Sequence, residues 1–191
     1  LTRGEKITSG MDPRLNQSGC TLIVLAEWKA PVYQNAITLI TSSIRRNGPA
    51  NIDSKIHHNN LINNILAKIE ANNAGADDAL MLDNNGFVAE TNACNILMIK
   101  NGMVFTPNAD ACLPGITRKT VITLCQQNNI PIHLKNISLT EMYNADQVFT
   151  TGTMGELTAV KMIDGRAIIN RSGTDLLQHI NDLFRNLTLA L

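Results

Sequence analysis

The chain has 191 residues, enough for one substantial core or for one domain with part of another. It is 44% hydrophobic and 17% charged, as in soluble globular proteins, and its 16 basic and 16 acidic residues leave no net charge. This balance does not favour a nucleic-acid partner or binding to an acidic membrane surface, and no apolar run is long enough to span a bilayer. Cys20, Cys94, Cys112 and Cys125 lack CxxC spacing and stand in apolar stretches. They predict buried thiols in a reducing compartment such as the cytoplasm, with no metal site.

The first residues predict two strands separated by a proline break. Cys20–Trp28 is an apolar run typical of a buried strand, and Ala36–Arg46 is rich in β-branched residues. Pro31 falls between them, so we place a domain boundary there. The predicted organisation is a separate segment at 1–30, a linker at 31–36 and one large domain at 37–191.

The large domain mixes helices with strands. Asn59–Asn72 spaces Leu61, Ile65 and Ile69 four residues apart, which predicts an amphipathic helix that Gly75 ends. Further helices are predicted at Thr117–Asn128, after the capping box of Ser138–Glu141, and at Thr174–Leu187. Strands are predicted at Ala79–Leu82, Phe87–Glu90, Asn95–Lys100, Met103–Pro107, Ile130–Leu134, Gln147–Thr151 and Leu157–Ile163. Several of these strands are joined by hairpin turns, so the pattern favours an α+β fold over a regular parallel βαβ array.

Four features are candidates for chemistry. Lys55 stands just before a predicted helix, and Glu90 lies at the end of a predicted strand. Leu113–Arg118 (LPGITR) is a glycine turn that opens directly into a helix, and Thr150–Glu156 (TTGTMGE) is a Gly/Thr turn between two strands. Backbone N–H groups in such turns and at a helix start form anion sites. Taken singly, each feature also fits a plainer interpretation: a solvated lysine, an edge carboxylate, an ordinary N-cap and a β-turn.

Together, in this order and spacing, these segments resemble the class IV (fold type IV) aminotransferases, which depend on pyridoxal 5′-phosphate (PLP). The similarity runs from about Cys20 to about Arg166 and is most specific at Glu90–Asn95 (ETNACN), Leu113–Arg118 and Phe149–Glu156 (FTTGTMGE). Branched-chain amino-acid aminotransferases are the nearest group. The resemblance implies the large C-terminal domain of these enzymes, a mixed or antiparallel barrel-like sheet with flanking helices. It also implies that residues 1–30 are the tail of a small N-terminal domain that is otherwise missing.

The resemblance assigns a role to each candidate residue. Lys55 would form the Schiff base with PLP and then move the proton during catalysis. Glu90 would pair with the pyridinium nitrogen, and Leu113 would pack on the ring face. Ile116 and Thr117 would bind the cofactor phosphate at the helix N-terminus, with Thr153 on the other side. The backbone of Thr153 and Met154 would face the substrate carboxylate.

Two positions depart from the family pattern or match it weakly. Branched-chain enzymes often carry a tyrosine five residues after the lysine, and Asn60 stands there instead. Its amide would offer a hydrogen bond to the cofactor's phenolic oxygen. Thr2-Arg3-Gly4 resembles the segment of D-amino-acid enzymes whose arginine clamps the substrate carboxylate, but Glu5 replaces their histidine. Arg3 is therefore a candidate substrate ligand, with an exposed strand arginine as the alternative.

The predicted reaction is transfer of an amino group between an amino acid, first an L-branched-chain one, and 2-oxoglutarate, in a homodimer. D-amino-acid transaminase and aminodeoxychorismate lyase are the alternatives within the family. There are also two non-catalytic alternatives: a truncated fragment that binds PLP without turnover, and an unrelated α+β binding module.

Overall fold

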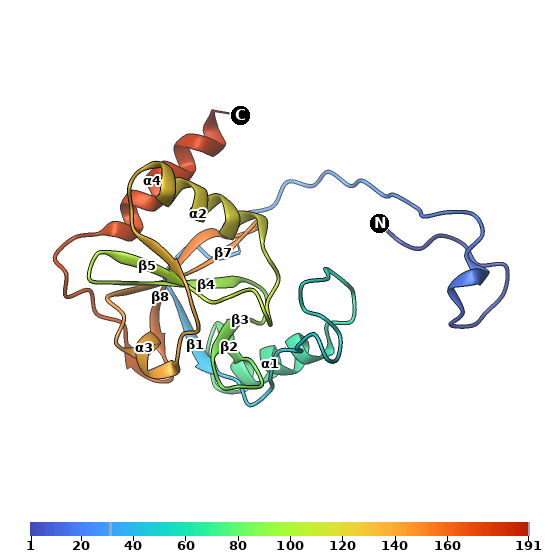
Figure 1. Ribbon diagram of the computed structural model, residues 1–191, viewed down its shortest axis with the longest axis horizontal. Coiled ribbons are helices and arrows are strands. Elements are labelled where there is room, and N and C mark those ends of the chain that lie inside the picture. Colours follow the sequence, from blue (N-terminus) through green and yellow to red (C-terminus); the bar gives the residue numbers. More distant parts are fainter. Residues whose placement is uncertain (31, 191) are drawn as a thin grey trace. The chain divides into compact units, whose positions relative to one another are not determined.

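The computed structural model describes residues 1–30 and 32–190. Pro31, in the predicted linker, and Leu191, at the end of the predicted large domain, lie outside the described residues. The chain divides into two compact units, Leu1–Ala30 and Pro31–Leu191 (Figure 1). Each unit is described by itself.

The first unit has little regular structure. It contains a short 3₁₀ helix, η1 (Pro13–Leu15), and an isolated antiparallel bridge between Thr2 and Thr21. Every residue from 21 to 30 is exposed. The predicted buried strand at Cys20–Trp28 is therefore wrong, because within residues 1–30 this apolar run has no strand to complete its hydrogen bonds and no core to cover it. The predicted burial of Cys20 fails for the same reason, since its thiol is exposed.

The second unit is built on a mixed sheet that curls into a half-barrel, with nine strands among the described residues (Figure 1). Eight strands run in the order β3-β2-β1-β8-β7-β4-β5-β6, and β9 pairs with β8. The β1–β2, β1–β8 and β5–β6 pairs are parallel, and the other pairs are antiparallel. The strands are β1 (Ile37–Thr41), β2 (Asp78–Leu82), β3 (Val88–Thr91), β4 (Asn95–Lys100), β5 (Met103–Thr106), β6 (Ile132–Leu134), β7 (Gln147–Gly152), β8 (Glu156–Ile163) and β9 (Arg166–Ala167). The predicted α+β class is confirmed.

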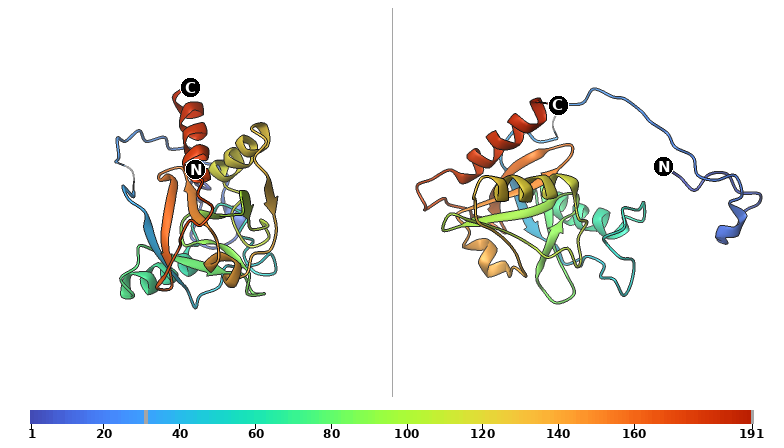
Figure 2. Two further views of the ribbon diagram at one scale, coloured as in Figure 1. Left: turned by 90° about the vertical axis from the view of Figure 1, so that its left-hand side faces the viewer. Right: turned by 45° about the horizontal axis from the view of Figure 1, so that its top comes forward.

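Within residues 32–190, four α-helices flank the sheet: α1 (Ile62–Asn73), α2 (Ile116–Gln127), α3 (Leu139–Tyr143) and α4 (Leu176–Leu189). Helices α2 and α4 lie side by side over β7 and β4 (Figure 2). The predicted inner face of α2, made by Val121, Leu124 and Cys125, is confirmed as buried. The capping box at α3 is also present, with Ser138 and Glu141 bonded reciprocally. No helix in the described part of the chain is long and apolar enough to cross a membrane.

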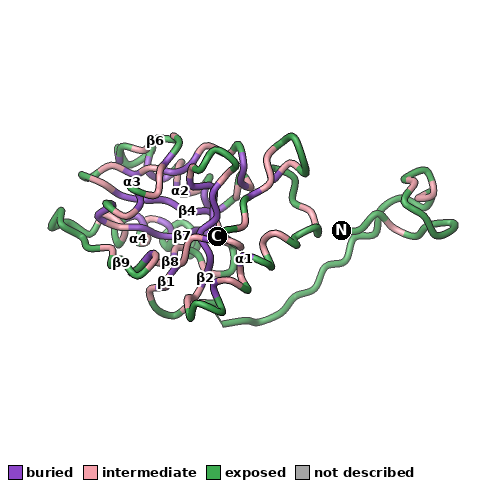
Figure 3. Tube along the Cα trace, turned by 90° about the horizontal axis from the view of Figure 1, so that it is seen from below, coloured by how far each residue is buried: buried purple, intermediate pink, exposed green. Residues whose placement is uncertain are grey.

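Strand β4 separates the two largest hydrophobic cores. Ile96 and Met98 point into the core inside the curled sheet, and Leu97 and Ile99 point into the core beneath α2 and α4. This alternation follows from the two-residue period of a strand. Because both faces are covered, β4 is an almost uninterrupted apolar run, and it lies among the most buried segments of the chain (Figure 3).

Helix α1 faces the sheet differently from the prediction. The small residues Ala67 and Ala71 pack against Ala79 and Met81 of β2. Small side chains let the helix backbone approach the strand closely, so the larger residues are turned outward. The predicted stripe is therefore exposed: Leu61, Ile62, Ile65, Leu66 and Ile69 keep between 41% and 57% of their surface accessible.

The same substitution, leucine to alanine, should affect stability differently in the packed core and in the first unit. Leu97 is fully buried, and Leu25 in the predicted strand is 79% exposed. We expect Leu97→Ala to lower the free energy of unfolding by about 2–5 kcal/mol, because it leaves a cavity between β4 and α2. Leu25→Ala should change it by less than about 0.5 kcal/mol. Urea denaturation tests both values, and equal losses for the two variants would contradict this burial pattern.

Candidate active site

One cavity of about 440 Å³ in the second unit brings together all six residues predicted to hold the cofactor. Its walls come from the loop between β1 and α1, the β3–β4 bend, the loop that enters α2, and the end of β7. Its lining residues are Lys55, His57, Glu90, Ala93, Cys94, Asn95, Leu113, Pro114, Gly115, Ile116, Thr117, Thr151, Gly152 and Thr153. Four segments that lie far apart in sequence thus converge on one space, lined by both polar and apolar groups.

Glu90 supplies a buried carboxylate to this cavity. It is 5% exposed, and its Oε1 atom lies 2.6 Å from Nη2 of Arg46. Its Oε2 atom accepts hydrogen bonds from the Asn95 amide at 3.0 Å and from the Leu113 backbone N–H at 3.4 Å. Burial raises the pKa of Glu90 to about 7, although the charge of Arg46 acts in the opposite direction.

Arg46 is a site residue that sequence reasoning missed. It is buried, its Nη1 donates to Oδ1 of Asn64 at 2.6 Å, and its Nε has no hydrogen-bond partner among the described residues. Arg45 precedes it directly and is exposed. The two adjacent arginines end the predicted strand Ala36–Arg46, and the sequence does not indicate which of them faces inward.

The N-terminus of α2 also lines the cavity. Gly115 is the N-cap and has no side chain to cap the helix, so the first N–H groups remain available to an anion. A Cβ atom on Gly115 would lie 2.1 Å from Oδ1 of Asn95, so no larger residue fits there without a shift. The Thr151 hydroxyl on the facing strand is buried and finds no partner within residues 1–30 and 32–190. Open N–H groups beside an unsatisfied hydroxyl suit a phosphate.

Arg118 does not belong to this anion site. It is buried and turned away, with Nε donating to the Thr106 hydroxyl at 3.0 Å and Nη2 to the carbonyl of Pro107 at 2.7 Å. Burial lowers the pKa of its guanidinium. Its role is to fix the first turn of α2 against β5.

Lys55 extends into the cavity from the loop before α1. Ser54 anchors this loop by donating to the carbonyl of Asn47 at 2.7 Å, and the Lys55 N–H donates to Asp53 at 3.0 Å. The side chain is 42% exposed, and Nζ lies 3.9 Å from Oδ2 of Asp53. The lysine therefore precedes α1 by seven residues rather than standing directly before a helix.

The main cavity does not include the other predicted residues, Met154, Arg3 and Asn60. Met154 lines a smaller side cavity next to the main one, and Thr153 lines both. Arg3 is exposed in the first unit, where its carbonyl accepts a hydrogen bond from Asn16 at 2.9 Å. Asn60 is exposed, its N–H donates to Nδ1 of His58, and it does not line the main cavity. Across the described residues, no group of three or more His, Cys, Asp or Glu side chains is placed to hold a metal ion.

Comparison with known proteins identifies the family of the chain. The family model for amino-transferase class IV matches residues 2–163. The chain belongs to the class IV aminotransferase family. It is 58% identical over 190 residues to "Branched-chain-amino-acid aminotransferase-like protein 2" of Arabidopsis thaliana, a match that covers 98% of this chain and 34% of that protein. It is 40% identical over 154 residues to the branched-chain-amino-acid aminotransferase of Pseudomonas aeruginosa, covering 76% of this chain and 50% of the relative.

Solved structures show the same architecture. The branched-chain aminotransferase from the thermophilic archaeon Thermoproteus uzoniensis, solved with norvaline, superposes with a TM-score of 0.77 at 33% identity, covering 82% of this chain and 52% of that one. An aminotransferase from Brucella abortus bound to PLP gives a TM-score of 0.78 at 28% identity, covering 84% and 57%. The predicted fold, that of the large domain of fold type IV aminotransferases, is confirmed. The chain spans about a third of the Arabidopsis relative and half of the Pseudomonas one.

The buried carboxylate predicts a defined pH dependence of stability. An unfolded glutamate titrates near 4.5, whereas folded Glu90 keeps its proton up to about pH 7. Between these values the folded state binds the extra proton, so the contribution of Glu90 to the free energy of unfolding falls as pH rises from 4.5 to 7. Glu90→Gln should flatten this slope in urea denaturation, whereas Glu27→Gln, at an exposed position, should retain it. An unchanged slope in Glu90→Gln would show that another group causes the dependence.

Proposed function

We propose that the protein is a PLP-dependent aminotransferase that moves an amino group between an amino acid and 2-oxoglutarate. The observation that carries this proposal is the single cavity in which Lys55, Glu90 and the N-terminus of α2 meet. An amine, a buried acid and an anion site are the three groups that a phosphorylated pyridine aldehyde needs from its protein. The four free cysteines support a reducing compartment such as the cytoplasm.

The residues present fit this cofactor. Its phosphate would be held by the N–H groups of Ile116 and Thr117, with Thr153 opposite and the unsatisfied Thr151 hydroxyl beside it. The absence of a Cβ at Gly115 leaves room for the Asn95 side chain against the start of α2. Leu113 lines the cavity between Glu90 and the helix start and offers an apolar surface to a ring.

When bound, PLP supplies an electron sink for the carbon from which a proton is removed. Lys55 would hold the cofactor and, once released, accept that proton at Nζ and return it. Glu90 would place its carboxyl against the ring nitrogen. Arg46, Asn95 and the Leu113 N–H fix this carboxyl from three directions, so its orientation does not depend on the ligand. The backbone of Thr153 and Met154 would face the substrate carboxylate, and Arg3 is a further candidate for that group.

For the substrate we propose an L-branched-chain amino acid: leucine, isoleucine or valine. The names of the relatives in Arabidopsis and Pseudomonas support this choice. A turnover panel of leucine, D-alanine and aminodeoxychorismate distinguishes it from a D-amino-acid transaminase and from a lyase. Turnover of leucine with 2-oxoglutarate is the expected result.

Borohydride reduction in the presence of PLP tests the cofactor site directly. We expect a stable pyridoxyl group on the peptide that contains Lys55, detected by mass spectrometry, and its loss in Lys55→Ala. Lys161→Ala is the matched control, because Lys161 is exposed on β8 and should leave the label in place. Label scattered over surface lysines, or retained in Lys55→Ala, would contradict the proposed site.

We also propose that the protein acts as a homodimer and that the exposed face of α1 lies in the contact. Five large aliphatic side chains, four on this face and one at the N-cap Leu61, keep between 41% and 57% of their surface exposed. The residues between them include asparagines, and the nearby charges of Lys68 and Glu70 are already bonded to Asp78 and to Ser42. An isologous contact brings each residue near its own copy, so an uncharged face avoids repulsion.

A charge placed on this face should disrupt the dimer. Ile65→Lys is expected to convert a dimer into a monomer in sedimentation velocity, because charged residues are disfavoured in interface cores. Leu134→Lys, at an exposed aliphatic position on β6, is the matched control and should remain dimeric. A dimer that persists in Ile65→Lys would exclude the α1 face as the interface.

A further inference from the structure

The side-chain amide of Asn64, in the first turn of α1, supports the Glu90–Arg46 pair. Its Oδ1 accepts a hydrogen bond from Nη1 of Arg46 at 2.6 Å, and its Nδ2 donates to the carbonyl of Asn92 at 2.8 Å. A guanidinium only donates and a carbonyl only accepts, so one orientation of the amide satisfies both partners. Arg46 in turn places Nη2 at 2.6 Å from Oε1 of Glu90. One helix residue thus connects the arginine that holds the acid to the β3–β4 bend.

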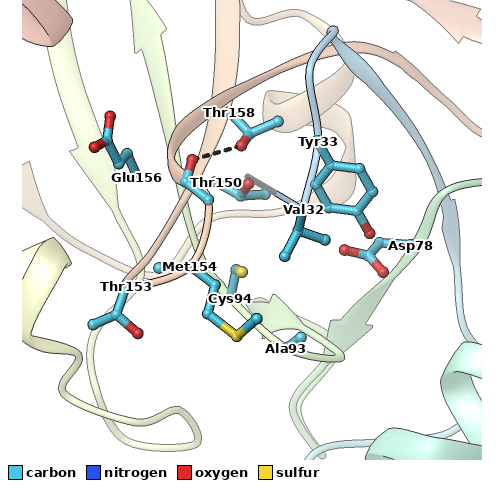
Figure 4. Close-up of a pocket in the computed structure, with 12 residues that line it drawn as sticks. Val32, Tyr33, Asp78, Ala93, Cys94, Thr150, Thr153, Met154, Glu156 and Thr158 are labelled. Atoms are coloured by element: carbon cyan, nitrogen blue, oxygen red, sulfur yellow. Dashed lines mark hydrogen bonds between the residues drawn. The ribbon is translucent and has the colours of Figure 1, made fainter. Parts of the chain in front are cut away.

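The packing of α1 brings Asn64 to this position. Asn64, Ala67 and Ala71 are separated by three and then four residues, so they lie on one face of the helix. Ala67 and Ala71 are fully buried against β2. Lys68 adds a second anchor, because its Nζ lies 3.0 Å from Oδ1 of Asp78, the first residue of β2 (Figure 4). The helix is therefore held to the sheet along the face that carries Asn64.

The second partner of Asn64 is fixed by the sheet as well. Asn92 directly follows β3, and its Oδ1 accepts a hydrogen bond from the Ala79 N–H at 2.7 Å. Its own N–H donates to the carbonyl of Ala79 at 2.9 Å. Ala79 is fully buried in β2, so the carbonyl that Asn64 contacts has little freedom to move. Asn64 therefore connects the loop that carries Arg46 to a rigid point on the sheet.

The position of the Arg46 guanidinium affects the ionisation of Glu90. Burial raises the pKa of Glu90 to about 7, and Arg46 lowers it through its charge and its hydrogen bond. This hydrogen bond requires the planar guanidinium to direct Nη2 at the carboxyl. Asn64 bonds Nη1 in that arrangement, and Nε has no partner in the described part of the second unit. Without the Asn64 amide, Nη2 would be the one bonded nitrogen of the group in the same part of the chain.

Several other titratable side chains lie near Glu90, and none of them is a hydrogen-bond partner of Asn64 among the described residues. They line a cavity together with Glu90 or interact with its charge: Lys55, His57, His58, Cys94, Cys112 and Arg118. The charge of Arg118 also lowers the pKa of Glu90. Burial raises the pKa of Cys94 to about 11 and that of Cys112 to about 12, so both thiols are neutral at physiological pH. A change at Asn64 therefore reaches Glu90 through Arg46.

We propose that Asn64 is a positioning residue of the active site: it holds the Arg46 guanidinium against Glu90, so that the acid meets the cofactor ring as a carboxylate in one orientation. The catalytic consequence rests on the proposed transaminase function, whereas the effect on Glu90 does not. Asn64 lines a cavity of about 240 Å³ that Arg46 and Glu90 also line, and it does not line the main cavity. It therefore acts through Arg46 and not by touching the cofactor or the substrate.

The ionisation of Glu90 in the full chain without cofactor tests the proposal directly. NMR follows the carboxyl-carbon resonance of Glu90, assigned with Glu90→Gln, as a function of pH. Asn64→Ala should lower the acid dissociation constant of Glu90 about tenfold, because the unanchored guanidinium no longer holds its charge at the carboxyl. Alanine is the best helix former, so α1 should persist. Asn63→Ala is the matched control: Asn63 donates to the carbonyl of Arg45 at 3.2 Å, and its loss should change the constant by less than about twofold.

A double-mutant cycle separates action through Arg46 from a local packing effect. Arg46→Lys keeps a positive charge but has no planar fork for Asn64 to orient. In that background, Asn64→Ala should change the dissociation constant of Glu90 by less than about twofold. A tenfold change in the Arg46→Lys background, or no change when Asn64→Ala is made alone, overturns the proposal.

Steady-state kinetics of the holoenzyme test the catalytic consequence. Asn64→Ala should lower kcat for leucine about tenfold and change its KM by less than about twofold, because Asn64 lies outside the main cavity. A higher KM with an unchanged kcat would overturn the positioning role. Absence of the pyridoxyl label on Lys55 would instead refute the proposed function, while the NMR titration still decides whether Asn64 controls the ionisation of Glu90.

Discussion

The buried amide of Asn95 joins the three segments that make the site. Its Nδ2 donates to Glu90 at the end of β3 and to the carbonyl of Leu113 in the loop before α2. Its Oδ1 occupies the space that a side chain on Gly115 would fill. Asn95 itself begins β4, the strand between the two largest cores. The position of the acid relative to the anion site is therefore set by the most buried part of the sheet.

The electrostatics follow from that burial. A carboxylate removed from water needs a partner, and Arg46 supplies it at 2.6 Å. Removal of either member of such a pair leaves an uncompensated charge and costs about 3–5 kcal/mol. Arg46 also holds the carboxyl of Glu90 in a fixed orientation beside the cavity. The loop that carries Lys55 is partly exposed, with 42% of the lysine side chain accessible. The fixed position of Glu90 does not depend on that lysine.

Sequence reasoning found the segments of the site but not the contacts between them. Helix α2 and strand β4 were predicted well because their apolar patterns match the surfaces they cover. Helix α1 was placed correctly and its inner face was not, because Ala67 and Ala71 fit the narrow space over β2 better than isoleucine does. The run at Cys20–Trp28 is apolar enough for a strand, yet a strand also depends on a neighbour that local sequence does not specify.

Arg46 shows most clearly which features of the site the sequence alone does not predict. Arg45 and Arg46 are neighbours in the sequence. The Arg45 side chain is exposed, whereas the Arg46 guanidinium is buried and pairs with Glu90. Cys94 is similar, since only the approach of Gly152 makes it part of a wall between two cavities. Such roles arise from tertiary packing, and a single sequence carries little trace of them.

A crystal structure of the protein grown with PLP is the most direct test of the central claim, that one cavity holds the cofactor between a lysine, an acid and a helix N-terminus. The account predicts that the cofactor is joined to Lys55, with its ring nitrogen at Glu90 and its phosphate at the N–H groups of Ile116 and Thr117. Cofactor bound at another lysine, or with its phosphate away from α2, would contradict the account.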